Sequence, residues 1–186
     1  MAHDEYIKKL VKGNAKRWND INFAAVNLKP GTTAPDFIPL FGSGGIYGWG
    51  FDGVNRTEEL HGSDEILHGL IEGTDLDIHV HWMPTTAGAG QVLWQIEYTI
   101  VQGGQVASAP VIISAAEATN SQAWEGINTD IAIISGAGIK IESHFVMRVF
   151  RDPTESADTY GADAALFGVG IHYRIDDIGS RSQLVK

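Results

Sequence analysis

Residues 73–98 contain two runs of alternating apolar and polar residues, separated by a turn rich in glycine and threonine. An extended chain places the two kinds of side chain of the first run on opposite faces: Ile78, Val80 and Trp82 against Asp77, His79 and His81. The second run alternates in the same way: Val92, Trp94, Ile96 and Tyr98 against Gln91, Gln95 and Glu97. This pattern predicts a β-hairpin with one apolar face, and that face requires a second layer to cover it.

The same alternation recurs toward the C-terminus, most clearly at 144–149 and 167–175. Turn signals separate the alternating segments, and no long helical pattern interrupts them. We therefore predict strands at 57–68, 75–83, 91–102, 109–115, 123–134, 142–151 and 164–176. Seven or eight short strands of this kind indicate an all-β protein, an antiparallel β-sandwich of jelly-roll type.

The residues before these strands differ in composition. Residues 1–17 are basic and carry apolar side chains at helical spacing within 4–12, which predicts a basic arm with a short helix, although a solvated terminus is a simpler interpretation. Residues 18–56 are rich in Gly, Pro and aromatic residues, so we expect an extended lead-in to a sandwich body at 57–186. These segments and the C-terminus supply the candidate partner-interface residues: Lys8, Lys9, Lys12, Arg17, Trp18, Trp49, Arg181 and Lys186.

Composition narrows the possible classes of protein. A chain of 186 residues with 44% hydrophobic content can bury one sizeable core, and the absence of cysteine excludes disulfides and thiolate metal sites. The net charge of −10 argues against a nucleic-acid partner. No apolar run is long enough to span a membrane, and no signal peptide is evident, so we expect synthesis in the cytoplasm and no membrane partner.

Histidines recur on the polar faces of the predicted strands: His79, His81, His144 and His172. Four imidazoles could converge on a metal, and the spacing from Gly73 through the first two matches the opening of a cupin metal motif. The glutamate that this motif requires is absent, because Thr85 and Thr86 stand at its position. We therefore expect no functional metal and no cofactor, and we keep these histidines only as weak metal candidates. Their face is expected to meet water or another subunit.

The carboxylates do not indicate an active site. Most of them are adjacent pairs, which point to opposite faces of a strand and cannot share a substrate. Asp75 and Asp77 do share a face next to His79, but solvated strand polarity explains this ladder. We also find no phosphate-binding glycine loop and no Gly-x-Ser-x-Gly elbow, so we expect no catalytic residue and no enzymatic activity.

Four motifs in order resemble a family of small, mostly unnamed virion proteins of tailed bacteriophages: IHVHW at 78–82, VLWQIEY at 92–98, ADTYGAD at 157–163 and IHYRIDDIGSR at 171–181. The resemblance covers about residues 18–186. It implies a non-enzymatic structural component of a virion, associated with the head or the tail, and it carries no catalytic residue to this chain.

Within this resemblance we expect a capsid decoration, or cement, protein on the capsid surface. Such a protein binds major capsid subunits or another virion protein, and we expect it to be a homo-oligomer, a dimer or a trimer. One alternative is a β-sandwich of the tail or fibre that attaches to host glycans, which predicts clustered exposed aromatic residues. A more remote alternative is a cupin-like metal enzyme.

Overall fold

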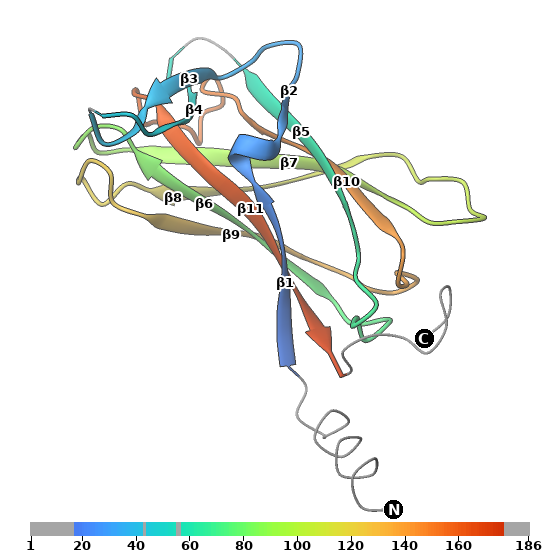
Figure 1. The fold of residues 1–186 in the computed structure, drawn as a ribbon. Coiled ribbons are helices and arrows are strands. Elements are labelled where there is room, and N and C mark those ends of the chain that lie inside the picture. The colour runs from blue at the N-terminus through green and yellow to red at the C-terminus, as the bar shows by residue number, and fades with distance from the viewer. Residues whose placement is uncertain (1–16, 43, 55–56, 177–186) are drawn as a thin grey trace, which may run out of the picture.

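In the computed structural model the described residues, 17–42, 44–54 and 57–176, form two antiparallel β-sheets that face each other (Figure 1). The seven predicted strands are all present and are shifted by a few residues at most: β5 (Glu58–Glu65), β6 (Leu76–Pro84), β7 (Gln91–Val101), β8 (Val111–Ala118), β9 (Ile127–Ile134), β10 (His144–Arg151) and β11 (Ala164–Ile175). The all-β prediction is confirmed. The predicted helix at 4–12 lies outside the described residues.

The order of the strands is that of a jelly roll. One sheet contains the order β4-β11-β6-β9 and the other contains β5-β10-β7-β8, so the chain passes back and forth between the two layers. All the pairs are antiparallel. The jelly roll therefore begins with β4 (Tyr47–Phe51), inside the segment that the sequence assigned to a lead-in.

Three further strands of the lead-in extend the two sheets. β1 (Arg17–Ala24) pairs along its whole length with β11, β2 (Lys29–Pro30) pairs with β5, and β3 (Asp36–Pro39) pairs with β4. Short 3-10 turns at Ala25–Asn27 and Leu40–Gly42 connect them. Residues 17–51 are thus part of the sandwich, and residue 57 does not mark its start.

The core lies between the two inner faces, as the alternation predicts. Ile78, Val80 and Trp82 of β6 are buried, and Trp94 of β7 is fully buried. The ring centroids of the two tryptophans are 6.2 Å apart, and that of Phe51 lies 5.1 Å from that of Trp94. The tryptophans on the apolar faces are therefore core residues.

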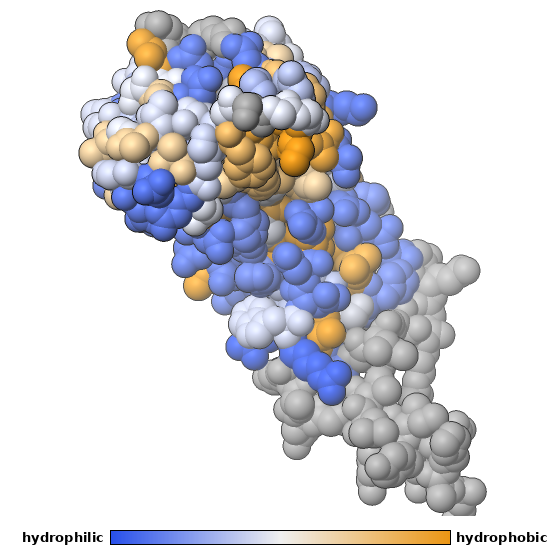
Figure 2. All heavy atoms as spheres, turned by 60° about the vertical axis from the view of Figure 1, so that its left-hand side comes forward, coloured by the Kyte–Doolittle hydropathy of each residue, from blue (hydrophilic) through white to orange (hydrophobic). Residues whose placement is uncertain are grey.

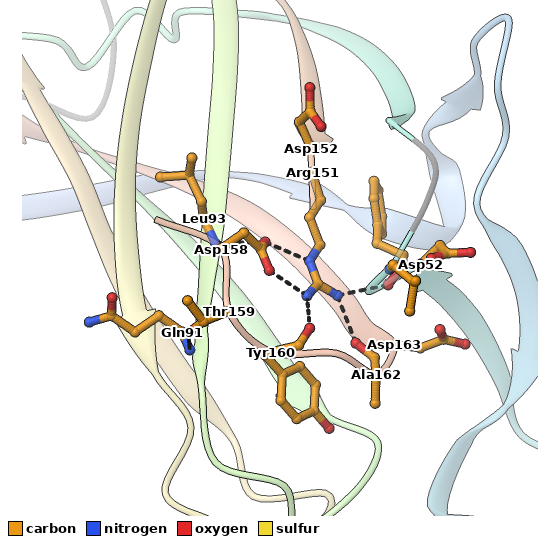
Figure 3. Close-up of polar contacts among 12 residues, drawn as sticks. Asp52, Gln91, Leu93, Arg151, Asp152, Asp158, Thr159, Tyr160, Ala162 and Asp163 are labelled. Carbon is orange, nitrogen blue, oxygen red and sulfur yellow. Dashed lines mark hydrogen bonds and ion pairs between the residues drawn. The ribbon is translucent and has the colours of Figure 1, made fainter. Parts of the chain in front are cut away.

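A buried ion pair fixes the loop after β10 (Figure 3). Arg151 has no exposed surface, and its Nε and one Nη donate to the two carboxylate oxygens of Asp158 at 2.8 and 2.7 Å. Its remaining N–H groups donate to the backbone oxygens of Phe51, Tyr160 and Ala162. All five guanidinium N–H groups are therefore used. Through them Arg151 holds the ADTYGAD segment beside the end of β4.

Within the described residues no helix has the length and apolar character needed to cross a bilayer.

Candidate functional site

A row of aromatic side chains runs along β4 from the core to the surface. Phe51, Trp49 and Tyr47 alternate along the strand and share its inner face. Phe51 is fully buried, Trp49 is partly buried against the core, and Tyr47 is 46% exposed. The apolar face of this sheet thus extends past the point where the other sheet covers it.

The neighbouring strand continues this exposed face. Phe37 of β3 lies opposite Trp49 in the strand pairing, and their ring centroids are 4.9 Å apart. The ring centroid of Phe37 is also 5.7 Å from that of Tyr47. More than half of the Phe37 side chain is exposed. Figure 2 shows hydrophobic residues gathered in the upper part of the molecule, at the height of β3 and β4 in Figure 1, above a largely hydrophilic middle.

A second aromatic pair lies just beyond β3. Phe41 and Trp124 are in contact, with ring centroids 5.7 Å apart, and both have left-handed backbone conformations, with φ of 61° and 63°. This conformation is unfavourable for bulky side chains and is concentrated at functional sites. Ile46, directly before Tyr47 in the chain, is also exposed. We call the group Phe37, Phe41, Ile46, Tyr47, Trp49 and Trp124 the aromatic overhang.

Local sequence explains why β4 can pair so closely at this edge. A side chain at Gly50 would come within 2.5 Å of Ile38, so glycine allows the Ile38 side chain to lie over the strand. The glycines that suggest irregular structure in the sequence are therefore what permits a regular β3–β4 pair.

The second cluster is formed by histidines on the outer face of the six-stranded sheet. His79 of β6 and His172 of β11 have ring centroids 4.3 Å apart, and the ring of His81 lies 4.6 Å from that of His79. His144 is exposed on β10 of the other sheet and does not join them. The structure thus brings together three of the four histidine candidates.

His79 differs from what the sequence indicated for this face, because it is only 5% exposed. Its partner across the strands is Gly170, and any side chain there would come within 2.3 Å of the imidazole. The ring therefore lies over bare backbone. The pKa of His79 is lowered, mainly because burial disfavours the charged ring and also because His81 and His172 are close, while Asp20 and Asp77 act in the opposite direction.

The predicted interface residues fall in different environments. Arg17 is exposed and lies opposite Ile175 at the end of β1. Trp18 is 53% exposed and packs on the guanidinium of Arg174, 4.0 Å from its ring centroid. Trp49 lies in the overhang and is partly buried, because it packs against the core. The other candidates, Lys8, Lys9, Lys12, Arg181 and Lys186, lie outside the described residues.

Comparison with known proteins identifies no family for this chain. No family model matches the sequence, and no curated protein matches it either. A chain of the infectious bursal disease virus Gx strain is 12% identical, with a TM-score of 0.42 over 88% of this chain and 33% of that chain. The chain thus spans about a third of the length of its viral match.

Two carbohydrate-binding modules are similar at the same level. The mannan-recognising TmCBM27 is 13% identical, with a TM-score of 0.39 over 85% of this chain and 99% of that module. TmCBM61, solved with β-1,4-galactotriose, is 11% identical, with a TM-score of 0.35 over 90% of this chain and 93% of that module. Likenesses this weak leave the function to be argued from the residues.

Proposed function

We propose that this protein is a non-catalytic structural protein of a virion, a decoration protein that binds capsid subunits through the aromatic overhang. The observation that carries the proposal is the row from Phe51 to Tyr47, which continues the core face of a sheet into solvent. An exposed aromatic group of this kind on a polar body marks a surface that binds a partner. The resemblance of the sequence to phage virion proteins favours a virion protein as the partner.

The chemistry of the overhang favours a protein partner over a sugar. Phe37 and Ile46 carry no hydrogen-bonding group, and the Phe37 ring packs against its neighbours Tyr47 and Trp49. Sugar recognition needs an open ring face with hydrogen-bonding groups beside it, whereas a covering protein layer needs apolar area. The overhang resembles a section of core from which the opposite layer is missing.

Replacing Phe37 and Tyr47 together by serine should weaken binding to capsids at least tenfold. Aromatic side chains at the centre of an interface commonly contribute more than 1 to 2 kcal/mol of binding free energy, which corresponds to about tenfold or more. Cosedimentation with particles that lack the protein measures the affinity. Electron microscopy of decorated particles locates the contact.

Trp18→Ser is the matched control, because Trp18 is similarly exposed and lies at the other end of β11. It should leave cosedimentation unchanged. A loss of binding in this variant, with the overhang variant unaffected, would move the interface to the β1 end of the sandwich and contradict the proposal. Circular dichroism confirms that both variants are folded.

Glycan attachment is the second candidate, and clustered exposed aromatic residues are what it predicts. Tyr47 and Trp124 each carry one hydrogen-bond donor within this cluster. A glycan-array signal that Tyr47→Ser abolishes would support attachment to host glycans over capsid decoration. If the protein decorates capsids, we expect it to bind no glycan on the array. Light scattering of the isolated protein should then show a dimer or a trimer.

A further inference from the structure

We propose that His79, His172 and Asp20 bind one divalent transition-metal ion, with Zn²⁺ the best fit, on the outer face of the six-stranded sheet. A ring nitrogen of each histidine and a carboxylate oxygen of Asp20 lie within 4.8 Å of one another. The three residues come from three adjacent strands, β6, β11 and β1. Ligand atoms this close together can share one ion once their side chains adjust to the distance of about 2.0 to 2.2 Å at which such ligands bind zinc.

The hydrogen bonds around His79 determine which of its nitrogens carries the proton. Asn128 Oδ1 can only accept, so His81 Nδ1, 2.5 Å away, donates to it. Nε2 of a neutral His81 then has a free lone pair, and it accepts from His79 Nε2, which is 2.8 Å away. His79 Nδ1 is consequently the unprotonated nitrogen of its ring.

That nitrogen is the observation that points to a ligand. His79 Nδ1 is buried and has no hydrogen-bond partner among the described residues. A buried lone pair without a donor is costly, and a bound cation would satisfy it. The two successive hydrogen bonds, from His79 to His81 and from His81 to Asn128, would then orient the metal-binding imidazole of His79.

The charges and ligand types also fit a transition metal. Two imidazoles and a carboxylate are a common zinc set and leave a fourth position for water. Asp77 lies opposite His172 on the neighbouring strand and adds negative charge beside the set. Hard cations such as Mg²⁺ and Ca²⁺ prefer oxygen ligands throughout, so two imidazoles select against them.

A second cluster of possible ligands, Glu65, His68 and Glu142, lacks this evidence. His68 Nε2 lies 3.2 Å from Glu142 and 3.9 Å from Glu65, so contacts among these three side chains themselves account for the arrangement. The two clusters make different predictions for point variants, which separates them experimentally.

The test is a titration of tag-free protein with Zn²⁺ by calorimetry, followed by Co²⁺ as a spectroscopic probe. The wild type should bind about one ion and melt at a higher temperature with Zn²⁺ present. His172→Asn and Asp20→Asn should each lose at least tenfold in affinity and lose the thermal shift. Both residues are on the surface side of the cluster, so these variants avoid the buried ring of His79.

Two matched variants serve as controls. His144→Asn removes an exposed imidazole from the other sheet, and Glu142→Gln removes a ligand from the second cluster; both should bind Zn²⁺ like the wild type. The proposal is overturned if the wild type shows no saturable binding, if His172→Asn and Asp20→Asn bind unchanged, or if Glu142→Gln is the variant that loses the ion. Circular dichroism without metal checks that each variant is folded.

Discussion

Arg151→Met should lower the free energy of unfolding by about 3 to 5 kcal/mol, because it leaves the buried carboxylate of Asp158 without its cation. Both side chains are inaccessible to solvent, at 0% and 1% exposure. The substitution also removes the donors to three backbone oxygens, those of Phe51, Tyr160 and Ala162. Among the described residues, Asp158 would retain only the backbone N–H of Leu93, 3.1 Å away.

Arg148→Met provides a matched control on the same strand. Arg148 pairs with Glu59 and Glu97 at 2.5 Å each, but its side chain is 29% exposed and these charges are partly screened. Its loss should cost about 1 kcal/mol or less. Urea denaturation followed by tryptophan fluorescence measures both variants. Equal losses of unfolding free energy for the two variants would show that the buried Arg151–Asp158 ion pair stabilises the protein no more than a partly exposed pair does.

Trp94→Ala should destabilise the protein by a similar amount, about 3 to 5 kcal/mol. Trp94 has no exposed surface and lies against Trp82 and Phe51, so the truncation leaves a cavity between the sheets. Its Nε1 has no hydrogen-bond partner in the described part of the chain, so the loss comes from packing alone.

Trp18→Ala is the comparison for this truncation, since more than half of Trp18 is exposed. It should cost about 1 kcal/mol or less, mainly from its contact with Arg174. Thermal and urea unfolding measure both. A melting curve for Trp94→Ala that matches the wild type would mean that the inner and outer faces of β7 are exchanged.

The strands that alternation predicts are those with long, regular patterns. β6, β7 and β11 each present apolar side chains at every second position over eight or more residues, and β10 does so from Phe145 to Val149. β4 has only five residues, two of them glycine, and β3 ends in proline, so both look like loops in the sequence. Their pairing depends on contacts with β11 and with Ile38, which no local pattern contains.

The two candidate sites show the same limit. Alternation correctly placed His79, His81 and His172 on an outer face, but the burial of His79 depends on Gly170 being its cross-strand partner. The overhang depends on where the second sheet ends. Register and layer overlap are long-range properties, so neither could be obtained from spacing along the chain.

The pairing of β1 with β11 has a practical consequence for work on this protein. Arg17 and Ile175 are cross-strand partners, whereas Leu166, at the opposite end of β11, lies beside Trp49. At about 3.3 Å per residue, these two ends of β11 are roughly 30 Å apart. A fluorophore or fusion partner placed beside Arg17 or Ile175 would therefore sit well away from the overhang, so cargo displayed at that end of the sandwich would leave the overhang uncovered.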